Sequence, residues 1–161
     1  MHYLTDMAYI AALPSLLCGL ALVVEDIRRF RVPRTWVLLG VLSQFAVFLV
    51  LAIVERNPAK VLMPLGYALL SAAIQFLLSR LKPGALGFGD VTASFLVGLA
   101  VGSFGLMLYL YWWLTMGALG LLWLLLWPRI VKPSFPTNSP KAPFVPVIVF
   151  AGILAALLAA I

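Results

Sequence analysis

Two aspartates are the residues of this chain whose type and position could do chemistry. Asp26 and Asp90 each lie where an apolar run of membrane length meets a basic loop, and Asp90 ends the tetrapeptide Gly87-Phe88-Gly89-Asp90. A carboxylate at the edge of a bilayer is costly, so an ionisable residue there is a functional hypothesis by default. Two carboxylates on one side of a membrane are a candidate acid and base pair.

Such a pair can hydrolyse an amide without a metal or a covalent intermediate. One ionised carboxylate takes a proton from water, while the protonated partner polarises the scissile carbonyl. The single histidine is His2 and the single cysteine is Cys18, which leaves no histidine-based triad and no zinc motif. Aspartyl chemistry is the hydrolytic chemistry that remains, and no metal ion is expected.

The segment before Asp90 is the predicted substrate-binding segment. Gly87 and Gly89 allow backbone angles that other residues avoid, and they let an extended peptide approach the main chain. We therefore expect Gly87, Phe88 and Gly89 to contact a substrate. A bulky side chain in place of either glycine should impair activity.

A plainer interpretation fits the same residues. A glycine and an aspartate before an apolar run are also typical of a capped helix start. Asp26, close to Arg28 and Arg29 in the chain, has the pattern of a solvated ion pair at the membrane surface. The residues alone leave both interpretations open.

The composition sets the class of protein that must position these aspartates. Hydrophobic residues make up 65% of the chain and charged residues only 10%, a balance typical of an integral membrane protein. The net charge of +6 comes from basic residues in short loops between apolar runs, which is the pattern of cytoplasmic loops in membrane proteins. We therefore expect a lipid bilayer as partner and no nucleic acid.

The apolar runs predict an all-α polytopic protein with six transmembrane helices in one membrane domain, 1–161. The run from Val91 to Pro128 is nearly twice the ~20 residues of one crossing, and residues 102–105 have the composition of a tight turn. The predicted helices are 8–24, 36–54, 61–79, 90–102, 106–127 and 144–161. Gln44 and Gln75 lie inside the second and third, where a side-chain amide most often links neighbouring helices.

The distribution of charge predicts the orientation. With six crossings, nine of the 11 lysines and arginines fall on one side of the membrane and only Arg56 and Lys60 on the other. Because basic loops face the cytoplasm, both termini are expected outside and both Asp26 and Asp90 at the cytoplasmic face. Glu25 also lies on that side, but at helical spacing it points about 100° away from Asp26.

The motifs around the two aspartates resemble those of a known family, the type IV prepilin peptidases, which are membrane aspartyl proteases of the GxGD class. Residues 26–33, Asp-Ile-Arg-Arg-Phe-Arg-Val-Pro, resemble the family's first catalytic motif, and Gly87-Phe-Gly-Asp90 resembles the second. Pro143-Phe-Val-Pro146 is similar to a further family feature, usually Pro-Phe-Gly-Pro. The six-helix pattern extends the resemblance over essentially the whole chain.

The resemblance implies an endopeptidase of the inner membrane, with Asp26 and Asp90 as catalytic residues. It implies cleavage of pilin-like precursors at the cytoplasmic face, after a short basic leader. The chain is similar to the short members of the family, which serve tight-adherence and related pili. It has no CxxC pair, and no S-adenosylmethionine or other cofactor is expected.

The chain departs from the family pattern at three positions. The family often has Lys where this chain has Thr92, Asn where it has Arg34, and Gly where it has Val145. The loss of a positive charge at Thr92 predicts a difference in substrate recognition or in the titration of the pair.

Other classes of function stay open. A non-enzymatic membrane transporter would use Asp26 and Asp90 as an ion or proton site, and an assembly subunit would not need them. A presenilin-like peptidase shares the GxGD motif, but the chain is short for that group and lacks its tyrosine-aspartate motif. The sequence does not specify an oligomeric state.

Overall fold

The computed structural model describes residues 2–81, 87–130 and 142–159, and these residues are all-helical apart from short connections. The prediction of an all-α chain is confirmed for them. Within the described ranges the helices are α1 (His2–Arg29), α2 (Arg34–Val54), α3 (Ala59–Leu81), α4 (Phe88–Gly102), α5 (Leu106–Ile130) and α6 (Val145–Leu158).

Four of these helices are long and apolar enough to cross a membrane, namely α1, α2, α3 and α5. The helices α4 and α6 are apolar but have only 15 and 14 residues. At 1.5 Å per residue each is about 20 Å long, less than the ~30 Å of a hydrocarbon core. The long apolar helices indicate a membrane-embedded protein.

The long apolar run is divided where the sequence predicts. Helix α4 ends at Gly102 and α5 begins at Leu106, and between them Gly105 has a φ of +94°. This left-handed backbone favours glycine because a side chain would be strained there. The prediction of two helices in this run is confirmed.

The helices extend into the charged segments that flank the apolar runs. Helix α1 continues past Val24 to Arg29, so Asp26 lies inside its last turns, and α5 continues past Trp127 to Ile130. Glutamate and arginine are good helix formers, so a charged residue ends an apolar run without ending the helix. An uncharged run therefore marks the apolar part of a helix and not its full length.

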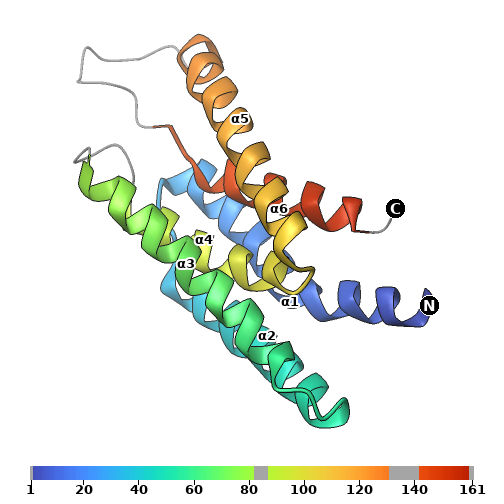
Figure 1. Cartoon of the computed structure of the whole chain (residues 1–161). Coiled ribbons are helices and arrows are strands. Elements are labelled where there is room, and N and C mark those ends of the chain that lie inside the picture. Colours follow the sequence, from blue (N-terminus) through green and yellow to red (C-terminus); the bar gives the residue numbers. More distant parts are fainter. Residues whose placement is uncertain (1, 82–86, 131–141, 160–161) are drawn as a thin grey trace.

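Helix α4 is at the centre of the bundle, where it packs against α1, α2, α3, α5 and α6. In Figure 1 its yellow ribbon lies among the other helices, and most of its side chains are buried. The helices α1, α3 and α5 end, and α2, α4 and α6 begin, toward the upper left of the view (Figure 1). We call this side the basic end, because Arg28, Arg29, Arg31, Arg34, Arg80 and Arg129 lie at these helix ends or in their connections.

Small residues allow α4 to pack closely on two neighbours. A Cβ atom at Gly98 would lie 2.7 Å from the Ser71 Oγ of α3, and one at Gly152 of α6 would overlap the Val97 side chain of α4. Small residues at helix contacts are typical of membrane proteins, because packing and not water exclusion holds such helices together. The close contacts fix α4 between α3 and α6.

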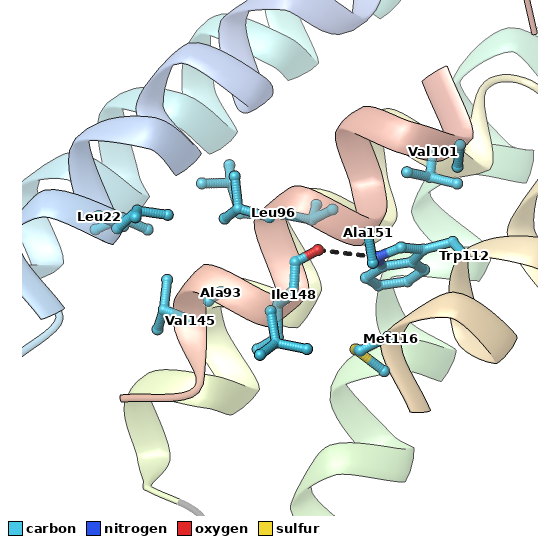
Figure 2. Packing of buried hydrophobic residues seen from close by; sticks show 14 of the residues in the cluster. Leu22, Ala93, Leu96, Val101, Trp112, Met116, Val145, Ile148 and Ala151 are labelled. Atoms are coloured by element: carbon cyan, nitrogen blue, oxygen red, sulfur yellow. Dashed lines mark hydrogen bonds between the residues drawn. The ribbon is translucent and has the colours of Figure 1, made fainter. Parts of the chain in front are cut away.

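The main hydrophobic core lies between α4, α5, α6 and α1 (Figure 2). Its largest side chain is Trp112, which is fully buried and donates from Nε1 to the Ile148 carbonyl oxygen at 3.0 Å. An indole N–H needs an acceptor when it is buried, and here the acceptor is a backbone oxygen of α6. This bond ties α5 to α6.

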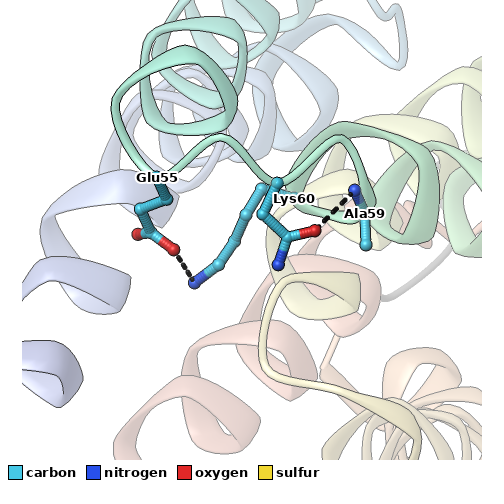
Figure 3. Close-up of polar contacts among 4 residues, drawn as sticks. Glu55, Ala59 and Lys60 are labelled. Atoms are coloured by element: carbon cyan, nitrogen blue, oxygen red, sulfur yellow. Dashed lines mark hydrogen bonds and ion pairs between the residues drawn. The ribbon is translucent and has the colours of Figure 1, made fainter.

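Polar side chains close the connection between α2 and α3, which lies at the opposite end of the bundle from the basic end (Figure 3). Lys60 forms an ion pair with Glu55 at 3.0 Å, and the Ala59 N–H donates to the Asn57 Oδ1 at 3.1 Å. Asn57 thereby satisfies one of the unpaired N–H groups at the start of α3.

Gln44 links α2 to α1 at the proline inside α1. Its amide accepts a hydrogen bond from the Ser15 N–H at 3.1 Å and donates one to the Ala11 carbonyl oxygen. An unbroken helix would pair these two backbone groups with each other, and Pro14 lies between them. Gln44 therefore satisfies backbone groups beside a proline, and the prediction that it links helices is confirmed.

Replacing Gln44 with leucine is expected to lower the free energy of unfolding by about 1 kcal/mol, because it leaves the Ser15 N–H and the Ala11 oxygen unpaired away from water. Unfolding by a denaturing detergent measures the change. Ser43→Ala is the matched control, since within the described ranges the Ser43 hydroxyl donates to carbonyl oxygens of its own helix alone. Equal stability of the two variants would contradict the assigned role of Gln44.

Candidate active site

Asp26 is a buried carboxylate that joins α1 to the start of α6. The residue is 8% exposed, and its Oδ2 accepts a hydrogen bond from the Val145 N–H at 3.2 Å. Val145 is the first residue of α6, so this N–H has no acceptor within its own helix. Asp26 therefore lies near the C-terminus of α1 and also at the positive N-terminal end of α6.

Asp90 is a buried carboxylate in the first turn of α4. Its residue is 9% exposed, and its Oδ2 accepts a hydrogen bond from the Gly87 N–H at 2.8 Å. The Asp90 N–H donates in turn to the Gly87 carbonyl oxygen at 3.0 Å. Asp90 thus caps its own helix, and its carboxylate also lies at the positive end of a helix dipole.

The structure brings the two carboxylates together from distant parts of the sequence. The helices α1, α4 and α6 pack against one another in all three pairs. Asp26 is close enough to Asp90 for its charge to act on the Asp90 carboxyl. In each carboxylate one oxygen accepts a backbone N–H, and the other accepts no hydrogen bond from the described part of the chain.

At Gly89, α4 lies close against the connection after α1. A Cβ atom at Gly89 would lie 2.5 Å from the Val32 Cγ2, whereas one at Gly87 would have no neighbour nearer than 3.7 Å among the residues that the structure describes. Neither glycine has a positive φ; in the described ranges Gly105 is the glycine with a positive φ. The freedom of backbone angle expected for Gly87 and Gly89 is thus not used, and Gly89 is needed for space.

Phe88 projects outward beside these glycines. The residue is 70% exposed, although most residues of α4 are buried. Together with Gly89 and Thr92 it lines one side of an open groove that α2 lines on the other. Two of the three predicted binding residues, Phe88 and Gly89, therefore line an accessible groove, whereas Gly87 is exposed but is not among its lining residues.

The plainer interpretation holds for Asp90 in part and fails for Asp26. Asp90 does cap a helix, as that interpretation requires. Asp26, however, is buried and forms no ion pair with Arg28 or Arg29. Arg29 instead pairs with Glu25 at 3.6 Å, which leaves Glu25 outside the carboxylate pair, as its helical position predicts.

Sequence reasoning did not identify Val32 and Val145 as parts of the site. Val145 is noted in the sequence only as a departure from a family motif, yet its N–H binds Asp26. A backbone donor leaves no signal in residue type, and the contact of Val32 with Gly89 joins two segments far apart in the chain. The proximity of each valine to a proline, Pro33 or Pro146, was the available signal that the backbone is constrained there.

The described residues include no group of three histidine, cysteine, aspartate or glutamate side chains placed to hold a metal ion. Comparisons of the chain with protein-family models, with curated proteins and with solved structures found no match. The arrangement consists of two buried carboxylates, each of which accepts a hydrogen bond from one backbone N–H, and of an open groove lined by Gly89, the neighbour of Asp90 in the chain.

Proposed function

We propose that the chain is a membrane aspartyl endopeptidase that removes a short basic leader from type IV pilin-like precursors. The observation that carries the proposal is the pairing of Asp26 and Asp90, two buried carboxylates that three helices bring within electrostatic reach. Buried, interacting titratable groups are enriched at functional sites, because burial and like charge tune their protonation. If the two residues served stability alone, neutral or apolar side chains in contact would cost less free energy to bury than two carboxylates.

In the proposed reaction Asp26 and Asp90 share one proton. The ionised carboxylate takes a proton from water as the water oxygen attacks the scissile carbonyl carbon, and the protonated carboxyl donates a hydrogen bond to the carbonyl oxygen. The C–N bond then breaks, and the leaving nitrogen takes up a proton from the pair. In each carboxyl the oxygen that accepts no hydrogen bond from the described residues is the one available for these transfers.

The choice of substrate rests on the resemblance of the motifs at 26–33, 87–90 and 143–146 to those of prepilin peptidases. We further propose six crossings of the inner membrane, with both termini outside and the basic end in the cytoplasm. A substrate helix would dock from the side and unwind beside Gly89, because a helical peptide keeps its carbonyl oxygens in its own hydrogen bonds.

The test is a cleavage assay of the purified protein in lipid with several pilin-like precursors, read by the masses of the products. We expect one cut, between a basic leader and the apolar helix that follows it. The masses locate the cut, and added methyl donor shows whether the new N-terminus is also methylated. Precursors that all stay intact would overturn the proposed activity.

A second candidate, an ion or proton transporter, is favoured by buried polar groups that continue from Asp90 along α4. Ser94 lies one helical turn after Asp90 and on the same face of α4. One turn further along this face, Gly98 packs against Ser71 of α3. Ser94 Oγ and Gln75 Oε1 are buried without a hydrogen-bond partner in the described ranges. Such groups are typical of water or ion paths in membranes.

Flux through the protein in sealed vesicles separates the two candidates. A transporter carries protons or cations in the absence of any peptide, and Asp90→Asn abolishes that flux. A peptidase cleaves precursors in open detergent micelles, where no gradient exists. We expect cleavage in micelles and no flux in vesicles.

A further inference from the structure

The groove beside Gly89 combines positive charge with an apolar wall. It has a volume of about 540 Å³ and lies between the connection after α1, the start of α2 and the start of α4. Arg31 and Arg34 line its charged part, and Val37, Leu38 and Phe88 line its apolar part. A ligand that fills it must satisfy both parts.

The charged part of the groove is suited to an anion. Arg31 and Arg34 are exposed, and neither forms an ion pair with a carboxylate of the described residues. Helix α2 begins at Arg34 after Pro33, and the N–H groups of its first turn have no acceptor within the helix. No side chain of the described residues caps this end. Two guanidinium groups beside an uncapped helix N-terminus are a favourable setting for a phosphate group.

The apolar part of the groove continues along a helix that is long and apolar enough to cross a membrane. Leu38 is 58% exposed and Leu42, one turn further along α2, is 64% exposed. In a bilayer such a surface faces acyl chains. The anion is therefore expected to carry acyl chains, whereas a soluble phosphate would leave this wall uncovered.

We propose that this groove binds an anionic phospholipid, with its phosphate between Arg31 and Arg34 and an acyl chain along Leu38 and Phe88. Basic pockets between membrane helices bind anionic headgroups in this manner. The proposal requires a membrane-embedded protein but not the peptidase activity. The lipid would hold the connection that carries Val32, which packs on Gly89 next to Asp90.

Native mass spectrometry of the purified protein, titrated with phosphatidylglycerol or phosphatidylcholine, tests this proposal. We expect the anionic lipid to bind at least about tenfold more tightly, since each basic side chain near a phosphate contributes to binding. Glycerol phosphate, which has the headgroup charge without acyl chains, should not compete. Equal binding of the two lipids, or full competition by glycerol phosphate, would overturn the proposal without any variant.

Paired variants then assign the site. Arg31→Gln with Arg34→Gln should remove the preference for phosphatidylglycerol, and Arg31→Lys with Arg34→Lys should retain most of it. Arg80→Gln with Arg129→Gln removes the same charge from the ends of α3 and α5, outside the groove, and should leave the preference unchanged. Loss of the preference in this control pair alone would place the lipid elsewhere and refute the assignment.

Discussion

Replacing Asp90 with asparagine is expected to reduce precursor cleavage at least about 10³-fold, and Asp26→Asn is expected to do the same. Asparagine can neither take a proton from water nor give one to the leaving nitrogen, and acid or base catalysis contributes about 10²- to 10⁴-fold for each group. Because both groups act in one proton cycle, the double variant should be little worse than either single variant. The rate of product formation, measured by mass, gives these ratios.

The asparagine variants keep the local structure, which makes the result interpretable. An amide oxygen can still accept the Gly87 N–H at position 90 and the Val145 N–H at position 26. We therefore expect both variants to unfold at nearly the same denaturant concentration as the parent protein. A loss of activity without a loss of stability identifies a chemical role and not a structural one.

Glu25→Gln is the matched control for these variants. Glu25 is the neighbour of Asp26 in the chain and carries the same charge, but it pairs with Arg29 outside the carboxylate pair. Its replacement should change the rate less than about threefold, because exposed ion pairs contribute little. The assignment of Asp26 and Asp90 as the catalytic pair is wrong if a folded variant of either residue keeps a cleavage rate within about tenfold of the parent. It is also wrong if Glu25→Gln lowers the rate as much as the aspartate variants do.

Replacing Gly89 with alanine is expected to lower the cleavage rate about 10²-fold. The new methyl group would lie 2.5 Å from the Val32 Cγ2 and 3.0 Å from its Cβ, and a β-branched side chain has little freedom to move away. Either α4 or the connection after α1 must shift, and Asp90 is the next residue. A displacement of about 1 Å at a catalytic group can cost about 10²-fold in rate.

Gly87→Ala is the control for Gly89→Ala. Gly87 also belongs to the GxGD motif, but a Cβ atom there meets no atom of the described residues closer than 3.7 Å, and its φ of −85° is open to any residue. Its replacement should leave the rate within a few fold of the parent. Val32→Ala combined with Gly89→Ala should recover part of the lost rate, because it removes the nearer of the two clashing groups.

The test compares the cleavage rates and stabilities of four proteins: the parent, Gly89→Ala, Gly87→Ala, and Gly89→Ala combined with Val32→Ala. Full activity of Gly89→Ala would show that the connection after α1 moves aside without affecting Asp90, and it would contradict the steric role of Gly89. Equal damage from Gly87→Ala and Gly89→Ala would point instead to a direct need of the substrate for both glycines. In that case the double variant with Val32→Ala should recover nothing.

Much of the secondary structure follows from the sequence by itself. Apolar runs of membrane length predict the helices, because backbone polar groups in a bilayer must be paired within the protein and a helix pairs nearly all of its own. The turn near Gly105 is also apparent, since one run is too long for a single crossing. Gln44 could be assigned to a link between helices because a buried amide requires partners. The two aspartates stand out because charge is rare in such segments.

Only the tertiary structure decided how these parts meet. Hydrophobic periodicity does not show which face of a membrane helix is buried, because the faces toward lipid and toward other helices are both apolar. The sequence therefore could not place α4 at the centre of the bundle, nor Val32 against Gly89. Nor could it place the Val145 N–H on Asp26, because a backbone donor is the same in every residue but proline and its partner depends on packing alone.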